Sequence, residues 1–315
     1  MKLGIIMDPI ERINIKKDSS FAMLLAAQSR GWEIYYMEQH DLFTDKDLAQ
    51  ARMNSLSVND NPADWFEKEE AAIHPLNMLD VILMRKDPPF NLNYIYTTYL
   101  LDHAERNGAL VVNKPEALRQ ANEKYFITHF IDCIPPTRIT GSIEFLLEFI
   151  DLHQDTIVKP LDGMGGLGIF RVRQDDPNKM AILEIATNNE TTPVMAQQYL
   201  TDISDGDKRI LLINGQPVDY ALARVPSKGE VRGNLARGGT SKGVALTDRD
   251  RWICEQVGPR LKDMGLMFVG LDVIGDYLTE INVTSPTCIR ELDKLYNINI
   301  ASQLMDAIEQ TINNR

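Results

Sequence analysis

The chain has 315 residues, of which 44% are hydrophobic and 25% charged, a composition typical of a soluble globular protein with two or three domains. Its formal net charge of −12 argues against nonspecific nucleic-acid binding, which needs a basic surface. The N-terminal apolar run is too short for a signal peptide, and no stretch has the length of a transmembrane helix. The three cysteines are far apart and lack C-x-x-C spacing, so they indicate neither a disulfide framework nor a zinc site, and they fit a reducing cytoplasm.

The first 120 residues alternate predicted strands and helices. We expect strands at 3–7, 33–37, 81–84 and 110–112, and helices at 18–28 and 94–106. This βαβ rhythm predicts a parallel sheet with helices on its faces. Residues 45–73 are polar and poor in β-branched residues, so we expect helix and loop there rather than sheet.

The middle of the chain predicts a compact unit of helices and strands. A long helical pattern covers 115–131 and ends before Pro135-Pro136. The elements expected after that break are helices at 142–153 and 179–187 and strands at 156–159, 169–173 and 194–199.

Beyond residue 202 the pattern becomes antiparallel, with two hairpins whose turns are Asn214-Gly215 and Gly275-Asp276. The expected elements are strands at 208–213, 218–225, 268–274 and 277–283, a helix at 248–264, and one or two helices that close the chain.

The most informative segment is the glycine-rich run at 159–171. It contains G-x-G-x-x-G at Gly163, Gly165 and Gly168, but a dinucleotide fingerprint needs a helix to follow. An alternating apolar and basic stretch follows instead, so the run predicts a hairpin loop with Lys159 on its incoming strand. The backbone N–H groups of such a loop can approach phosphate oxygens because glycine has no Cβ. A plain flexible hairpin is the alternative.

A second constellation lies on the last predicted hairpin. Glu280 and Asn282 are two residues apart on one strand and project to the same face, and the turn brings Asp272 alongside them. Two carboxylates and an amide oxygen are hard ligands suited to Mg²⁺. The alternative is that the acids lie on a solvated face, but their neighbours are strongly apolar.

Basic residues provide candidates for binding anions. Lys124 and Lys159 are candidates for nucleotide phosphates. Arg209 and Arg224 are on adjacent predicted strands and could face one cleft, where a guanidinium binds carboxylate or phosphate bidentately. Any one of these arginines taken alone is more often a surface residue, and the prediction rests on the set.

Residues 226–243 form a long glycine-rich basic loop that carries Arg232 and Arg237. A loop of this length in a compact protein predicts a lid or a disordered connector. A lid that excludes water would protect a reactive intermediate, and its arginines would suit an anionic substrate.

Several other catalytic templates are absent from the sequence. It contains no G-x-x-x-x-G-K-[ST], no kinase signature and no G-x-S-x-G elbow, and its five histidines lie outside every constellation described above. Catalysis by histidine is therefore not expected.

Together these segments resemble the ATP-grasp ligases and, within them, the bacterial glutathione synthetase family, over essentially the full chain. The lysine, glycine-loop and Glu-x-Asn pattern specifies only ATP-grasp, whereas Arg85 and Thr284-Ser-Pro-Thr287 narrow it further. The segments that carry the resemblance are 7–9, 13–20, 85–90, 113–115, 159–166, 206–209, 269–272 and 279–287.

The resemblance implies an α/β and α+β architecture, with an ATP-grasp fold preceded by a parallel-sheet N-terminal domain. The implied domains are 1–123, a central lobe at 124–200 with the glycine loop, and a C-terminal lobe at 201–315 with the metal site and the lid. It also implies a homo-oligomer, specifically a homotetramer.

Residue roles follow from the resemblance and the patterns combined. Gln198 stands where asparagine is expected, which matters little if its backbone contacts the base. The residues expected to bind ATP are Lys124, Lys159, Gly163, Gly165, Gly166, Gly168, Gln198, Tyr199, Leu200 and Asp207. Those expected to hold Mg²⁺ or Mn²⁺ are Asp272, Glu280 and Asn282. Those expected to bind the acid substrate are Arg85, Arg224, Arg232, Asn282 and Ser285, with Arg209 and Lys159 as catalytic residues.

The implied reaction joins γ-glutamylcysteine to glycine with ATP, through an acyl phosphate. One rival is another carboxylate–amine ligase of this fold, such as a D-alanine–D-alanine or glutamate-adding enzyme. Another is a non-catalytic ATP-binding regulator, against which the retention of the acidic and basic residues argues.

Overall fold

The first sheet contains the predicted parallel core. The structure is a computed structural model that describes residues 1–227 and 240–315, and within these the sheet has the path β3-β4-β2-β1-β7-β8, with β5 and β6 also paired to β4. The pairs β1–β2, β1–β7 and β7–β8 are parallel, as predicted. The elements of this core are β1 (Lys2–Ile6), α1 (Ser19–Ser29), β2 (Glu33–Met37), β7 (Val81–Met84), α2 (Leu92–Arg106) and β8 (Leu110–Val112).

The prediction of helix and loop at 45–73 was wrong. Four strands between residues 42 and 75 pair antiparallel instead and extend the sheet. From Ala49 to Met53, every second side chain of β4 is buried, which is the period of a strand. The apolar residues here are mainly Ala, Met and Leu, so the alternation was not accompanied by β-branched residues. The added elements are β3 (Leu42–Asp45), β4 (Leu48–Val58), β5 (Phe66–Lys68) and β6 (Ala72–Pro75).

The prediction of one long helix at 115–131 was also wrong. The α-helix α3 (Pro115–Gln120) stops early, and a 3₁₀ helix follows at Tyr125–His129. Between them, the Asn122 side-chain oxygen accepts hydrogen bonds from the N–H groups of Lys124 and Tyr125, at 3.1 and 2.8 Å. An asparagine side chain that binds nearby N–H groups competes with helix formation. The other 3₁₀ helices are Ile10–Arg12, Gln39–Asp41, Leu76–Met78, Ile131–Cys133 and Thr201–Asp205.

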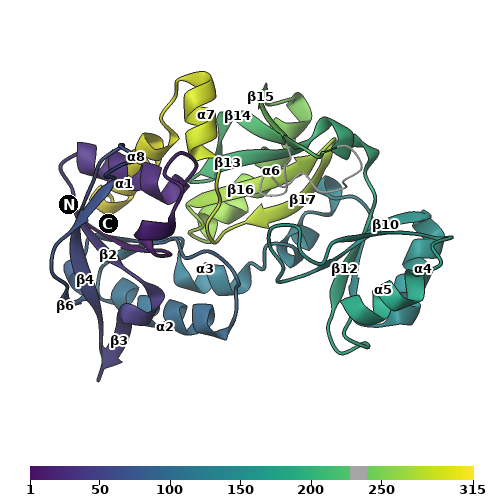
Figure 1. The fold of residues 1–315 in the computed structure, drawn as a ribbon, viewed down its shortest axis with the longest axis horizontal. Coiled ribbons are helices and arrows are strands. Elements are labelled where there is room, and N and C mark those ends of the chain that lie inside the picture. The colour runs from purple at the N-terminus through teal and green to yellow at the C-terminus, as the bar shows by residue number, and fades with distance from the viewer. Residues whose placement is uncertain (228–239) are drawn as a thin grey trace.

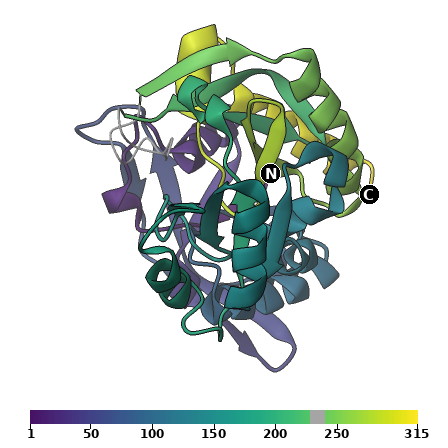
Figure 2. The same ribbon diagram turned by 90° about the vertical axis from the view of Figure 1, so that its right-hand side faces the viewer.

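The second sheet is fully antiparallel, with the order β11-β10-β12-β9. Two helices cover one face and bury a small core around Phe149, Val158 and Leu183. Figure 1 shows this unit at one end of the molecule, and in Figure 2 its helices face the viewer. Its elements are β9 (Thr137–Thr140), α4 (Ile143–His153), β10 (Asp155–Pro160), β11 (Phe170–Arg173), α5 (Lys179–Ala186) and β12 (Val194–Gln198).

The third sheet has the order β15-β14-β13-β16-β17 and lies between the other two (Figure 1). Both predicted hairpins are confirmed. Residues 240–243, predicted as the end of a loop, instead begin β15 because they pair with β14. The elements are β13 (Asp207–Ile213), β14 (Gln216–Val225), β15 (Thr240–Ala245), α6 (Asp248–Asp263), β16 (Phe268–Ile274), β17 (Tyr277–Asn282) and α7 (Ile289–Tyr296).

The last helix, α8 (Ile300–Asn313), connects the C-terminal end of the chain to the N-terminal sheet. Its buried side chains belong to the same hydrophobic cluster as those of α1. Arg30 of α1 donates hydrogen bonds to the backbone oxygen and hydroxyl of Ser302 and pairs with Asp306 at 2.6 Å. In the described residues, no helix is long and apolar enough to cross a membrane.

Candidate active site

A cavity of about 410 Å³ lies where the second and third sheets meet the N-terminal unit. It brings together most of the residues predicted from sequence. Those that line it are Lys124, Lys159, Gly163, Gly165, Gly166, Gln198, Tyr199, Leu200, Asp207, Arg209, Arg224, Asp272, Glu280, Asn282 and Ser285. Gly168 belongs to the same loop, whereas Arg232 and Arg237 lie outside the described residues.

Two arginines hold the carboxylate of Asp272. Arg209 lies opposite it in the β13–β16 register and donates two hydrogen bonds, at 2.6 and 3.1 Å. Arg224 lies 3.0 Å from the same carboxylate. Burial alone would raise the pKa of Asp272, but the two guanidinium charges outweigh it and hold that pKa well below its usual range. The predicted convergence of Arg209 and Arg224 on one cleft is confirmed.

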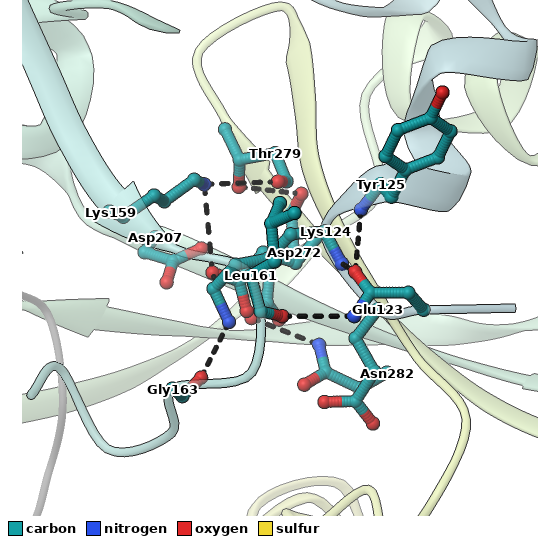
Figure 3. Close-up of polar contacts among 12 residues, drawn as sticks. Glu123, Lys124, Tyr125, Lys159, Leu161, Gly163, Asp207, Asp272, Thr279 and Asn282 are labelled. Carbon is teal, nitrogen blue, oxygen red and sulfur yellow. Dashed lines mark hydrogen bonds and ion pairs between the residues drawn. The ribbon is translucent and has the colours of Figure 1, made fainter. Parts of the chain in front are cut away.

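Two lysines flank Glu280. The ammonium groups of Lys124 and Lys159 lie 3.7 and 3.6 Å from its carboxylate. Burial, with the nearby charge of Lys124, lowers the pKa of Lys159, while Glu280 opposes this shift. Lys124 also donates a hydrogen bond to the backbone oxygen of Gly163 at 2.6 Å, so it links β17 to the glycine loop (Figure 3).

Asn282 completes the predicted metal-binding set. Its amide nitrogen donates to Asp272 at 3.2 Å, and Figure 3 shows the two side chains pointing toward each other. Asp272, Glu280 and Asn282 supply the oxygen donors that Mg²⁺ prefers, so their chemistry fits this ion. In residues 1–227 and 240–315 there is no cluster of three or more His, Cys, Asp or Glu side chains arranged for a metal. In proteins, Mg²⁺ usually keeps several water ligands and is often also bound by substrate phosphates.

The glycine loop joins β10 to β11, as predicted, and β10 carries Lys159. Three of its glycines, Gly165, Gly166 and Gly168, have φ between +64° and +74°, which favours residues without a side chain. Met164 and Leu167 at its tip are 45% and 61% exposed. The loop residues that line the cavity are Gly163, Met164, Gly165, Gly166 and Leu167, and none of them carries a charge.

The end of β12 forms another wall. The guanidinium of Arg171 stacks on the Tyr199 ring, 3.6 Å from its centroid. The N–H groups of Gln198 and Tyr199 already donate to the backbone oxygens of Pro136 and Asp155. If a backbone N–H reads a base edge here, that role therefore falls to Leu200.

Asp207 is buried between the charged groups and the cavity. One of its oxygens pairs with Arg224, and the other has no hydrogen-bond partner among the described residues. Burial, together with the charge of Asp272, raises the pKa of Asp207 to about 7, against the opposing effect of Arg224. An unpartnered buried acceptor in a cavity wall suits a ligand hydroxyl, such as those of the ATP that Asp207 is expected to bind.

Two family models match the chain. The prokaryotic glutathione synthetase N-terminal domain matches residues 1–119, and the ATP-grasp domain of the same enzyme matches residues 123–297. The glutathione synthetase of Pseudomonas putida is 58% identical over 315 residues, covering 100% of this chain and 99% of the relative. The chain belongs to the prokaryotic glutathione synthetase family.

Other members of this family are almost as similar. The glutathione synthetase of Pseudomonas aeruginosa is 58% identical and covers 98% of this chain and 97% of the relative. That of Escherichia coli is 55% identical and covers 98% of both chains.

Solved structures confirm the ATP-grasp fold. A D-cycloserine synthetase superposes with a TM-score of 0.68 at 12% identity, covering 99% of this chain and 100% of the other. An ATP-grasp ligase complexed with a minimal precursor, Mg and ADP has a TM-score of 0.62 at 17% identity, covering 99% and 98%.

Within this family fold, Arg85 lies behind the cavity wall. Its guanidinium is buried, donating to the hydroxyl of Ser20 at 3.0 Å and to the backbone oxygen of Pro286 at 2.9 Å. The described residues that line the cavity do not include it. Direct contact between Arg85 and substrate stays a prediction, whereas its support of the 285–286 segment is observed.

Glu123 is a further residue of the site, and no sequence pattern predicted it. One of its carboxylate oxygens accepts hydrogen bonds from the N–H groups of Val283 and Thr284 and from the Thr284 hydroxyl, at 3.1, 3.2 and 2.8 Å. Its backbone oxygen accepts the N–H of Ile281 at 2.9 Å. Glu123 thus fixes the segment around Asn282 on both sides. The mistaken helix at 115–131 hid this role, because it placed Glu123 on an ordinary helix turn.

Proposed function

We propose that this chain joins γ-glutamylcysteine to glycine with ATP, forming glutathione, ADP and phosphate through an acyl phosphate. The observation that carries this proposal is one cavity that holds two charged clusters and a glycine loop. One cluster is Asp272 with Arg209 and Arg224, and the other is Glu280 with two lysines. Full-length similarity to glutathione synthetases supports the choice of substrates.

The chemistry explains why this arrangement suits the reaction. A carboxylate does not acylate an amine, because its leaving group is poor and its charge repels nucleophiles. A carboxylate oxygen of γ-glutamylcysteine attacks the γ-phosphorus of ATP, the bond to the β-phosphate oxygen breaks, and ADP leaves. The glycine amine, after losing a proton, then attacks the acyl carbon, and phosphate leaves with the former carboxylate oxygen.

Positive charge is what both steps need. Phosphoryl transfer depends mostly on positioning and charge neutralisation. In our proposal, Lys124 and Lys159 bind the phosphates of ATP, while Arg209 stabilises the acyl phosphate and the tetrahedral oxyanion that follows. Asp272, Glu280 and Asn282 would hold Mg²⁺, which supplies additional charge neutralisation when bound.

The remaining predicted roles belong to the same proposal. The glycine loop covers the phosphates, Gln198, Tyr199 and Leu200 surround the adenine, and Asp207 binds the ribose. Arg224, Arg232, Asn282 and Ser285 bind the acid substrate or its carboxylates.

We also propose the division into units at 1–123, 124–200 and 201–315, a cytoplasmic location and a homotetramer. Three buried free cysteines suit a reducing compartment. Light scattering of the purified protein tests the oligomeric state.

The proposed function is tested by measuring ADP release with ATP, Mg²⁺, γ-glutamylcysteine and glycine, omitting one component at a time. We expect ADP and glutathione to form in equal amounts and only when all components are present. ADP release that is indifferent to both amino-acid substrates, or that requires a different acid, would contradict the proposal.

A further inference from the structure

The cavity has one carboxylate that the charged clusters do not use. The carboxylates that line it in the described residues are Asp87, Glu123, Asp207, Asp272 and Glu280. The last three pair with Arg or Lys, and Glu123 accepts three hydrogen bonds from Val283 and Thr284. In the described part of the chain, Asp87 alone among these five forms no ion pair and accepts a single hydrogen bond on its carboxylate, although the buried Arg85 interacts with it electrostatically from two residues away.

Asp87 is exposed at the edge of the cavity but is held firmly in place. One carboxylate oxygen accepts a hydrogen bond from the hydroxyl of Ser285 at 2.5 Å. Its backbone N–H donates to the Asp8 side chain at 3.0 Å. Two residues earlier, Arg85 donates to the backbone oxygen of Pro286, which ties this loop to the 285–286 segment. The carboxylate is therefore fixed relative to Ser285 before any ligand binds.

Its place also matches the length of the proposed acid substrate. The reacting carboxylate must lie beside Arg209, close to Asn282, and Ser285 is three residues further along the chain. The chain bends at Thr284 and Ser285, so residues 282–285 span less than the roughly 10 Å of three extended residues. The seven bonds from the cysteinyl carboxyl carbon to the glutamyl α-nitrogen span about 8–9 Å when extended, which is enough to cover this segment. A substrate lying along residues 282–285 would place its glutamyl end next to Asp87.

Resting on the proposed function, we propose that Asp87 binds the α-ammonium group of the γ-glutamyl end and thereby selects acids that carry this group. An ammonium ion needs anionic or carbonyl acceptors, and the other four carboxylates that line the cavity in the described residues already have cationic or N–H and O–H partners. The hydroxyl of Ser285 orients the carboxylate of Asp87, which leaves the other oxygen for the ligand.

The test compares Asp87→Asn with the unmodified protein, using γ-glutamylcysteine and N-glutarylcysteine, which is the same acid without the α-amino group. In the unmodified protein, loss of the amino group should raise KM about 10- to 100-fold, because hydrogen bonds to charged groups contribute roughly that much. Asp87→Asn should raise KM for γ-glutamylcysteine similarly and change KM for N-glutarylcysteine by less than about threefold. The KM for ATP should not change.

Asp47→Asn is the matched control, because it removes the same charge from an exposed position on the β3–β4 turn. It should leave all three KM values unchanged. Should Asp87→Asn fold poorly, Asp87→Ala provides the same comparison. Equal increases in KM for both acids, or no increase for γ-glutamylcysteine, would overturn the assignment of Asp87. Absence of product from γ-glutamylcysteine in the unmodified protein would instead overturn the proposed function.

Discussion

Two antiparallel hairpins contribute to the same cavity, and they differ in burial, in the length of the connecting loop and in charge. The β16–β17 hairpin is largely buried and closes with the short turn at Gly275-Asp276, and its acids are paired with cations. The β10–β11 hairpin closes with the long loop 161–169, which is largely exposed and rich in glycine. One hairpin holds its acids beside cations, and the other closes with an exposed loop whose cavity-lining residues are uncharged.

This difference explains how the site can bind a highly charged nucleotide. Buried charges are costly without partners, so the acids of the first hairpin are compensated by arginines and lysines from neighbouring segments. Electrostatic stabilisation is most effective when the groups are positioned beforehand. The glycine loop does not carry this cost because its residues that line the cavity are uncharged.

The largest predicted effect comes from removing a cation that pairs with the β16–β17 hairpin. Arg209→Met should lower kcat by about 10²- to 10³-fold, as expected for loss of an oxyanion-stabilising group. ATP binding, measured by calorimetry, should be largely retained because the lysines remain. Arg106→Met, at an exposed position on α2, is the control and should keep full activity. A full-rate Arg209→Met variant would remove Arg209 from the mechanism.

The second prediction concerns the support of the rigid hairpin. Glu123→Ala leaves the three hydrogen-bond donors of Val283 and Thr284 without their acceptor, so Asn282 should lose its position. We expect a Mg²⁺ requirement about tenfold higher, since a lost positioning partner of a metal ligand typically costs 10- to 100-fold. Glu123→Gln keeps an acceptor oxygen and should restore most of this loss. If Glu123→Ala and Glu123→Gln both had the Mg²⁺ requirement of the unmodified protein, Glu123 would not position Asn282.

A matched pair of glycine substitutions, one in each hairpin, tests whether the two hairpins contribute differently to stability and to ATP binding. In Gly163→Ala, the new Cβ would meet Pro160 at 2.7 Å and the Leu167 backbone oxygen at 3.3 Å, so the exposed loop must shift. The KM for ATP should rise several-fold with little change in Tm, because loops of few buried contacts contribute little to global stability.

In Gly275→Ala, the new Cβ meets Asp202 at 2.9 Å at a position with φ of +56°. Here the free energy of unfolding should fall by about 1–3 kcal/mol, the usual cost of a strained backbone position. Urea denaturation and ATP titration of both variants are the measurements. Similar losses of stability in the two variants would contradict the distinction between the hairpins.

The smallest predicted effect lies outside both hairpins. Burial raises the pKa of Asp293 to about 6, although its carboxylate accepts the N–H of Ile300 at the start of α8. The folded state therefore binds more protons than the unfolded state between pH ~4 and ~6, and the stability from this group is lost as pH rises through 6. Asp293→Asn should gain stability relative to the unmodified protein between pH 4 and 7, measured by urea denaturation. If the difference in stability between Asp293→Asn and the unmodified protein did not change across this pH range, the raised pKa of Asp293 would be contradicted.

Most of the site could be predicted from sequence because its residues lie on short, strongly patterned elements. The hairpin turn at Gly275-Asp276 was enough to bring Asp272 beside Glu280 and Asn282. What could not be predicted depends on contacts between distant segments. Glu123 contacts Val283 across 160 residues, and no local pattern reports such a pair. The strand β4 was missed for a different reason, since its alternating apolar residues lack β-branching.

The most direct test of the central claim follows an oxygen atom. The purified protein is supplied with ATP, Mg²⁺, glycine and γ-glutamylcysteine whose cysteinyl carboxylate carries ¹⁸O at both positions. An acyl phosphate requires that one labelled oxygen leave with phosphate while the other remains in the new amide. Mass spectrometry should therefore find one ¹⁸O in each phosphate released. Phosphate without label would contradict activation of the carboxylate by phosphoryl transfer.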